Sequence, residues 1–218
     1  MASLKLSEIF FSVQGEGSRS GLPCVFVRLH GCGLRCRWCD TPYALDHTTG
    51  GDVVDIDTIL GDVARSGCRF VELTGGEPLE QEAVHELIGR LCDEGYEVAI
   101  ETGGHVDISD VDPRAILIMD LKCPASGMAR RNLWTNIEYL KPGDEVKFVI
   151  ADREDFEWSC AMLREHRIHE RVGTVLFSPV FGTLANVDLV RWILDERVPV
   201  RFQLQMHKYI WSPDTRGV

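Results

Sequence analysis

The sequence is poor in basic residues and in long apolar runs. Its 218 residues hold 23 Lys and Arg against 34 Asp and Glu, a formal net charge of −11. Nucleic acids and anionic membranes bind basic surfaces, so the acidic excess argues against both as partners. No apolar run is long enough to span a bilayer, and residues 1–11 lack the charged-then-apolar pattern of a secretory signal. We therefore expect a cytoplasmic protein.

Cysteine is also scarce, with eight residues in the whole chain. Five of the eight are scattered, mostly in apolar surroundings, and we expect these to be ordinary free thiols. The other three, Cys32, Cys36 and Cys39, have C-x3-C-x2-C spacing, and Trp38 directly precedes the last. This cluster is the most distinctive feature of the sequence.

The clustered cysteines predict an iron–sulfur site. They follow the apolar run 23–30, which is typical of a buried strand, and two glycines let the loop turn back on itself. Three thiolates can bind three irons of a four-iron cube and leave the fourth iron open to an outside ligand, as catalytic metal sites do. A zinc site completed by His30, His47 or Asp40 is the alternative.

Strand and helix patterns alternate along most of the chain. We expect strands at 4–11, 23–30, 69–74, 97–101, 115–121, 145–150, 173–177 and 200–205, and helices at 55–65, 79–94, 129–140, 152–166 and 186–196. Near-continuous apolar strands between helices predict a parallel sheet covered by helices. Eight complete β/α units need about 250 residues. The sequence therefore predicts one α/β domain, residues 1–218, folded as a partial open (β/α)6-like barrel with shortened helices.

Unusual polar residues follow the ends of the predicted strands. They are Gln14 and Glu16, the three cysteines, Gly75-Gly76-Glu77, Thr102-Gly103, Asp120 with Lys122, Ser178, and His207. The carboxyl ends of parallel strands meet at one rim, where ligands bind in such folds. We therefore expect the functional site at that rim.

Several of these side chains have two possible uses. Arg28 lies in an apolar strand, where a lone charge is costly, so it either pairs with a carboxylate or binds an anionic ligand. Lys122 either binds a ligand or pairs with Asp120. Asp40 and Thr41 offer oxygen ligands suited to Mg²⁺, or they cap a helix.

The motif Gly-Gly-Glu-Pro at 75–78 also allows two interpretations. Its glycines would let a ligand approach the backbone closely, although the same residues make a plain turn. His207 is either a site residue or a core histidine bonded to backbone.

The cysteine loop with its aromatic residue resembles the signature of the radical S-adenosylmethionine (SAM) enzymes. Further motifs resemble one family within that superfamily, 7-carboxy-7-deazaguanine synthase. These motifs are residues 8–17, the C-x3-C-x2-C-D-T loop, and residues 74–78, 101–103, 120–124 and 205–209. The resemblance covers essentially the whole chain.

The resemblance implies a radical SAM carbon–nitrogen lyase that acts on 6-carboxy-5,6,7,8-tetrahydropterin. SAM cleaved at a 4Fe–4S cluster would start the removal of a hydrogen atom from C6 of this pterin. The ring then contracts, ammonia leaves and 7-carboxy-7-deazaguanine, a queuosine precursor, forms, while SAM is regenerated. The resemblance also implies Mg²⁺, a one-electron reductant such as flavodoxin or ferredoxin, and a homodimer.

The resemblance assigns roles to individual residues, with the radical itself generated on SAM. For the cluster these are Cys32, Cys36 and Cys39; for Mg²⁺, Thr41; for SAM, Trp38, Gly76, Glu77, Asp120, Lys122 and Ser178; and for the pterin, Val13, Gln14, Gly15, Glu16, Arg28, Thr74 and His207.

Two other functional classes share parts of this pattern. A glycyl-radical activating enzyme has the same cysteine loop, but Gln14, Glu16 and Thr41 suit a small polar ring and a metal rather than a protein backbone. A non-enzymatic electron-transfer or metal-binding module would not need polar motifs at five or six strand ends. We therefore favour the lyase.

Overall fold

A single sheet of nine strands, in the order β3-β1-β2-β4-β5-β6-β7-β8-β9, forms the centre of the protein. The computed structural model describes residues 2–218. The strands are β1 Ser3–Val13, β2 Pro23–Leu29, β3 Asp52–Asp55, β4 Phe70–Gly75, β5 Glu97–Thr102, β6 Ile116–Leu121, β7 Glu145–Ile150, β8 Thr174–Pro179 and β9 Arg201–Phe202. All neighbours from β2 to β9 are parallel, whereas β1 is antiparallel to both β2 and β3.

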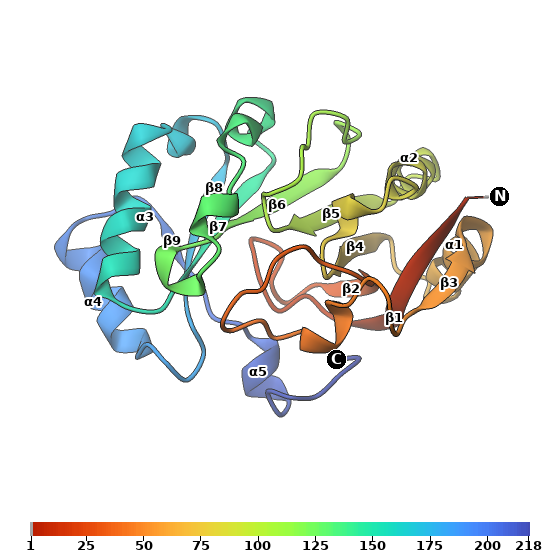
Figure 1. Cartoon of the computed structure of the whole chain (residues 1–218), viewed down its shortest axis with the longest axis horizontal. Helices are drawn as coiled ribbons and strands as arrows, with labels where there is room; N and C mark the ends of the chain where they lie inside the picture. Colours follow the sequence, from red (N-terminus) through yellow and green to blue (C-terminus); the bar gives the residue numbers. More distant parts are fainter. Residues whose placement is uncertain (1) are drawn as a thin grey trace.

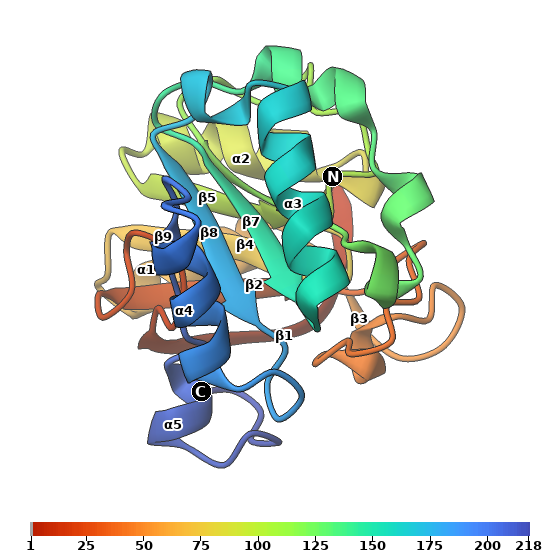
Figure 2. The ribbon, with the colours of Figure 1, turned by 90° about the vertical axis from the view of Figure 1, so that its left-hand side faces the viewer.

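Four α-helices cover one face of this curved sheet (Figures 1 and 2). They are α1 Ile56–Arg65, α2 Val84–Asp93, α3 Arg153–Glu165 and α4 Asn186–Asp195. Their apolar sides pack on the alternate strand residues that point outward, and this layer contains most of the buried apolar side chains. A short fifth helix, α5 His207–Ile210, lies apart from the four, near the loop that follows β2 (Figure 1).

The sheet curves but does not close, because β3 and β9 are its two edges. The crossovers from β5 to β6 and from β6 to β7 contain no α-helix. The expected partial open (β/α)6-like barrel with shortened helices is confirmed. No helix among residues 2–218 has the length and apolar content needed to cross a bilayer.

The expected helix at 129–140 is wrong. This region holds two 3-10 turns, Ala129–Arg131 and Trp134–Tyr139. The amide of Asn132 bonds both main-chain groups of Lys122, and the amide of Asn136 donates to the carbonyl of Val106 at 2.7 Å. Asparagine side chains that bond distant backbone compete with continuous helix.

Three smaller differences concern element ends. Strand β3 was not predicted, and β9 is two residues long instead of six. Helix α2 begins at Val84 rather than near residue 79, because Pro78–Glu80 forms a separate 3-10 turn. In contrast, α1 begins where expected, with the Asp55 carboxylate accepting from the Thr58 amide at 2.9 Å.

The direction of β1 changes how the N-terminal motif reaches the site. Because β1 is antiparallel to β2, its end at Val13 lies opposite Pro23, at the start of β2. The expectation that residues 14–16 share the rim of the parallel strands is therefore wrong. The loop after β1 instead crosses the amino ends of the strands, where the amide of Ser18 donates to Glu145 at the start of β7.

Candidate active site

The cysteine loop leaves the carboxyl end of β2, as predicted. Its backbone is fixed by bonds from Gly31 N to Ala44 O (2.7 Å) and from Arg37 N to Ser126 O (3.2 Å). Cys32 is buried, and Cys36 and Cys39 are half-buried; all three are free thiols. Among residues 2–218, no three His, Cys, Asp or Glu side chains are placed to share one metal ion. A four-iron cube makes no such demand, because each cysteine binds a different iron.

Burial disfavours the thiolate form in this loop, and one main-chain donor partly offsets that effect. Burial raises the pKa of Cys32 to about 11 and also raises that of Cys36. The amide of Leu34 donates to the sulfur of Cys32 at 3.4 Å, which favours a charged sulfur. Metal binding at such thiols releases their protons.

Gly75 and Gly76 are required by the close approach of two main chains. A Cβ atom on Gly76 would lie 2.1 Å from the carbonyl oxygen of Gly31, and one on Gly75 would lie 2.2 Å from that of Leu29. Gly75 also has a φ of +137°, which favours glycine. These glycines therefore let the cysteine loop pack directly against the end of β4.

The side chain of Glu77 is buried and bonded entirely within the protein. Its carboxylate accepts from the Gly103 amide at 2.7 Å, the Leu79 amide at 3.1 Å and the Thr102 hydroxyl at 2.9 Å. Burial raises the pKa of Glu77, and the neighbouring His105 partly offsets this effect. This carboxylate links the segment after β4 to the end of β5, so only the backbone of the Gly-Gly-Glu-Pro motif faces the cysteine loop.

Glu80 also links the cysteine loop to neighbouring segments, and the sequence analysis did not identify this residue. Its carboxylate accepts from the Gly33 amide at 2.8 Å and bonds the ring of His105 at 2.7 Å, and it lies 3.2 Å from the ring of His47. The two histidines belong to loops after β2 and β5. Glu80 therefore holds the cysteine loop to both of them.

The concave face of the sheet carries polar side chains at alternate strand positions. On β4 these are Glu72 and Thr74, on β5 Glu101, on β6 Asp120 and on β7 Lys147. Sequence reasoning missed Glu72, Glu101 and Lys147 as site residues. The signal was available, since each is a charge in an otherwise apolar strand, the same argument that singled out Arg28.

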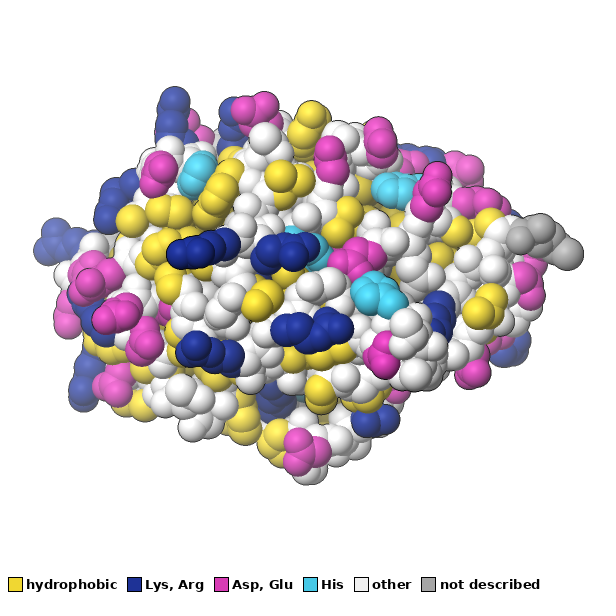
Figure 3. All heavy atoms as spheres, viewed as in Figure 1, with side chains coloured by type: hydrophobic (Ala, Val, Ile, Leu, Met, Phe, Trp, Pro, Cys, Tyr) yellow, Lys and Arg dark blue, Asp and Glu magenta, His cyan; other side chains and the backbone are white. Residues whose placement is uncertain are grey.

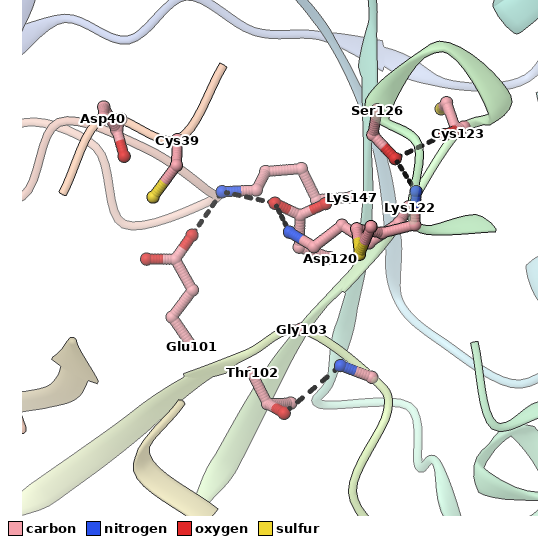
Figure 4. Close-up of polar contacts among 12 residues, drawn as sticks. Cys39, Asp40, Glu101, Thr102, Gly103, Asp120, Lys122, Cys123, Ser126 and Lys147 are labelled. Carbon is pink, nitrogen blue, oxygen red and sulfur yellow. Dashed lines mark hydrogen bonds and ion pairs between the residues drawn. The ribbon is translucent and has the colours of Figure 1, made fainter. Parts of the chain in front are cut away.

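Lys147 is the centre of this polar face. Its ammonium lies 3.7 Å from Asp120 and donates to Glu101 (Figure 4). It also lies 2.9 Å from the carboxylate of Glu16. Burial by itself would lower the pKa of Lys147, but the carboxylates, Glu101 above all, raise it well above its usual value. Lys147 is therefore a permanently charged group inside the barrel.

Two further glutamates on this face have opposite pKa shifts. Burial opposes the charged form of Glu16, but Lys147 and the hydrogen bond from Gln205 together outweigh burial and lower the pKa of Glu16. Burial, reinforced by Glu101 and Glu16, raises the pKa of Glu72 well above its usual value. Glu72 accepts a hydrogen bond from the amide of Gln14.

The loop after β1 meets the C-terminal segment directly. A Cβ on Gly15 would lie 2.5 Å from Nδ1 of His207, and the Gly15 carbonyl accepts from the Met206 amide at 2.9 Å. The carboxylate of Glu16 accepts from the amides of Gln203 and Gln205, each at 3.0 Å. The N-terminal and C-terminal motifs therefore form one floor beneath the concave face.

Of the two uses predicted for Arg28, the structure shows the pairing with a carboxylate of this chain. Its Nε donates to the Glu8 carboxylate at 2.8 Å, and its guanidinium lies 5.6 Å from the centre of the Phe10 ring. The Tyr43 hydroxyl donates to the same Glu8 oxygen at 2.7 Å. Because only Nε is engaged by Glu8, the ion pair orients the guanidinium without using its outer nitrogens.

Two buried polar atoms on the concave face have no partner among the described residues. They are Oδ1 of Asp120 and Oγ of Ser178. The other oxygen of Asp120 pairs with Lys122 at 2.9 Å, and this pair raises the pKa of Lys122 although burial opposes the charge. Buried polar atoms normally have partners, so these two mark a place for a polar ligand.

Asp40 and Thr41 lie between the cysteine loop and the C-terminal segment. The hydroxyl of Thr41 lies 3.8 Å from the sulfur of Cys39 and donates to the Gly75 carbonyl at 3.4 Å. The Asp40 carboxylate lies 3.3 Å from the Lys208 ammonium. Lys208 lowers the pKa of Asp40 against the effect of burial. Neither side chain caps the short turn that follows.

Comparison with known proteins identifies the family. The sequence signature of the Radical SAM superfamily matches residues 26–120. A 7-carboxy-7-deazaguanine synthase of Chlorobaculum tepidum is 44% identical over 100% of this chain and 98% of its own length. One from Koribacter versatilis is 41% identical over 99% and 100% of the two chains. The chain belongs to the 7-carboxy-7-deazaguanine synthase family.

Solved structures agree with this family in fold. The crystal structure of QueE from Escherichia coli matches 94% of this chain and 95% of its own, with a TM-score of 0.76 and 22% identity. SuiB from Streptococcus suis, bound to its precursor peptide SuiA, matches 80% of this chain and 46% of its own at a TM-score of 0.55 and 13% identity. At these identities the likeness establishes the radical SAM fold alone.

Membership of the 7-carboxy-7-deazaguanine synthase family makes this chain a radical SAM lyase. The family's chemistry depends on a 4Fe–4S cluster and SAM; the three thiols are suitable cluster ligands, and the two unpartnered polar atoms are suitable hydrogen-bond partners for SAM. A zinc module and a glycyl-radical activating enzyme are thereby set aside.

Proposed function

We propose that this chain converts 6-carboxy-5,6,7,8-tetrahydropterin to 7-carboxy-7-deazaguanine and ammonia, with SAM used catalytically, in the synthesis of queuosine precursors. Full-length relatives carry the name of this activity. The observation that carries the proposal is the polar concave face itself. Its floor joins the two terminal motifs around Lys147, directly beneath strand ends that hold the cysteine loop.

For the cofactors, we assign the thiols of Cys32, Cys36 and Cys39 to the cluster. The cluster and SAM together supply the one-electron chemistry that starts the reaction. Oγ of Ser178 and Oδ1 of Asp120 are placed to bond SAM, since both are buried and unpartnered. Trp38, Gly76, Glu77 and Lys122 complete the proposed SAM site, with Glu77 acting through its backbone.

For the pterin, we assign a carboxylate end and a ring. The outer nitrogens of Arg28 are suited to the substrate carboxylate, because a guanidinium binds carboxylates through two parallel bonds. Thr74 is held by Glu101 at 3.2 Å and faces the same space. The loop of Val13, Gln14, Gly15 and Glu16, together with His207, provides the floor on which the ring would rest.

We also propose Mg²⁺ at Thr41. This hydroxyl lies beside Cys39 and is accompanied by the Asp40 carboxylate, and both are oxygen donors of the kind that Mg²⁺ prefers. A Mg²⁺ ion there would bind the substrate carboxylate between the cluster loop and Arg28.

The reductant that we propose is an acidic one-electron carrier, such as a flavodoxin or ferredoxin. Segments 28–39 and 121–137 contain six Lys and Arg residues and no Asp or Glu, although the whole chain carries −11. Four of the six are exposed and form no ion pair within residues 2–218: Arg35, Arg37, Arg130 and Arg131. In Figure 3 basic side chains gather across the middle of the face that carries the cysteine loop. A basic surface beside the cluster would attract such a carrier.

We further propose a single-domain, cytoplasmic homodimer. A reducing compartment suits the eight free cysteines of this chain. The exposed apolar side chains of Phe11 on β1 and Val53 on β3 lie on neighbouring strands at the sheet edge and are suited to a subunit contact. Light scattering of the purified protein measures the subunit number directly.

An anaerobic assay tests the proposed activity. The chain, reconstituted with iron and sulfide, is supplied with SAM, Mg²⁺, a reductant and carboxytetrahydropterin, and the product is followed by absorbance and mass. We expect 7-carboxy-7-deazaguanine to form in excess over any SAM consumed. A four-iron chromophore that SAM perturbs, but no turnover of the pterin, would overturn the substrate assignment and leave the superfamily chemistry in place.

A further inference from the structure

Lys147 joins three carboxylates that come from three different elements. Glu16 belongs to the floor loop, Glu101 to β5 and Asp120 to β6. The side chain of Lys147 is 4% exposed, so solvent does not screen these contacts appreciably. Within residues 2–218, Lys147 is the one cation within ion-pair distance of Glu16 and of Glu101.

Each of these carboxylates also makes a polar contact with a residue other than Lys147, and the three contacts lie in different parts of the site. Glu16 binds Gln205 of the C-terminal segment at 3.0 Å. Glu101 accepts from the Thr74 hydroxyl at 3.2 Å. Asp120 pairs with Lys122 and presents its unpartnered oxygen toward the proposed SAM site. Glu16 is itself a proposed pterin-binding residue and Glu101 holds another, Thr74, whereas Asp120 belongs to the proposed SAM site.

The arrangement depends on the positive charge at its centre. Glu72, Glu16, Glu101 and Asp120 place four carboxyl groups on one buried face, and like charges at such distances repel strongly. Without Lys147, the carboxyl groups would take up protons or move apart. Either change would move Glu16 and Glu101 relative to Asp120.

We propose that Lys147 is a positioning residue that fixes the pterin site relative to the SAM site, so that hydrogen transfer to and from the substrate is efficient. This inference rests on the proposed function. Lys147 does not need to touch the substrate, because it acts through Glu16, Glu101 and Asp120. Hydrogen transfer is sensitive to displacements of about 1 Å. Loss of the Lys147 ion pairs should therefore lower the amount of product formed for each SAM cleaved.

The experiment compares Lys147→Met and Lys147→Arg with Lys141→Met as the matched control. Lys141 pairs with the buried carboxylate of Asp144 at 2.6 Å, just before β7, and its other side-chain bond is to the carbonyl of Ala115, so it contacts none of the assigned site residues. It therefore reports the cost of losing a lysine–carboxylate pair without touching the site. The measurements are iron content, pterin affinity by anaerobic calorimetry, and the ratio of 5′-deoxyadenosine released to product formed.

We expect Lys147→Met to retain iron within twofold, to weaken pterin binding at least tenfold and to raise the ratio of released 5′-deoxyadenosine to product at least tenfold. Lys147→Arg keeps the charge and should bring that ratio to within about threefold of the wild type. Lys141→Met should lower thermal stability and leave the ratio unchanged.

An unchanged ratio in Lys147→Met, with only its stability reduced, would overturn the inference. Should the Met variant fail to hold the cluster, Lys147→Gln, which keeps a polar side chain of similar reach, is judged by the same ratio. A wild-type protein that does not turn over the pterin overturns the proposed function instead, so the two failures are distinguishable.

Discussion

The carboxylate of Glu16 lies 2.9 Å from the ammonium of Lys147, although the two residues are 131 positions apart in the chain. This contact brings the loop after the first strand under the middle of the sheet. It also explains why Glu16 stays charged inside the protein, because Lys147 lowers its pKa against the effect of burial. The floor of the proposed pterin site depends on this ion pair.

Replacement of Cys36 by Ala should remove the cluster. Two remaining thiolates on a short loop do not hold a four-iron cube, so we expect iron below about a tenth of the wild-type content and no detectable product. Iron and sulfide analysis with electron paramagnetic resonance measures this. Cys92→Ala, in a half-buried thiol on α2, is the control and should retain both. A full cluster in the Cys36 variant would show that another side chain is the ligand.

Replacement of Arg28 by Ala should weaken substrate binding while SAM cleavage remains possible. Loss of charge-assisted bonds to a carboxylate costs about 1.5–3 kcal/mol, or roughly 10- to 150-fold in affinity. The measurement is the pterin KM together with equilibrium binding. Arg69→Ala, which removes a guanidinium stacked on Tyr96 outside the site, is the matched control. Unchanged pterin affinity would mean that Arg28 serves only to pair with Glu8.

Replacement of Thr41 by Ala should reduce the response to Mg²⁺. Removing one oxygen ligand weakens a site that binds Mg²⁺ through few protein groups, so we expect the Mg²⁺ concentration for half-maximal rate to rise about tenfold. Titration of the rate with MgCl₂ measures this. Thr135→Ala, at an exposed position on the turn 134–139, should titrate like the wild type. If both variants respond alike, Thr41 is not a Mg²⁺ ligand.

Replacement of Gly76 by Ala should dislodge the cysteine loop. The added Cβ would meet the Gly31 carbonyl at 2.1 Å, a contact that only a backbone shift can relieve. We expect slower cluster reconstitution and a several-fold loss of bound iron. Gly89→Ala is the control, because nothing lies within 4 Å of its Cβ in the interior of α2. That helix change should stabilise the protein by about 1 kcal/mol.

Replacement of Glu72 by Gln should stabilise the protein increasingly as the pH rises. The folded-state pKa of Glu72 is raised well above its ordinary value of 4.5, first by burial and then by Glu101 and Glu16. Its contribution to stability is therefore fully present below about pH 4.5 and is lost as the pH rises toward the folded-state pKa. A neutral amide avoids that loss, so we expect a gain of about 1–3 kcal/mol at pH 8 and little at pH 4.

Thermal unfolding of the cluster-free protein between pH 4 and pH 8 measures the effect. The control is Glu97→Gln, which makes the same change at a half-exposed carboxylate paired with Arg19 outside the concave face. A gain of the Glu72 variant that did not grow with pH would contradict the raised pKa.

Patterns among neighbouring residues determined a large part of the secondary structure of this protein and the position of its cysteine loop. The cysteine loop after β2, the alternation of strands and helices, and the start of α1 are all recorded in neighbouring residues, so they were predicted with the correct order and nearly the correct bounds. The continuous helix expected at 129–140 failed because Asn132 and Asn136 bond backbone groups of distant segments. Periodicity carries no information about such partners.

The tertiary structure alone decided how the site is assembled. Strand direction depends on which strands pair, so only the fold placed residues 14–16 beneath the sheet rather than at its rim. It also brought Lys147 to three carboxylates from separate elements, and it showed that Gly76 accommodates the backbone of the cysteine loop. These relationships are contacts between residues far apart in the chain, and their energy depends on burial and distance, which a linear sequence does not contain.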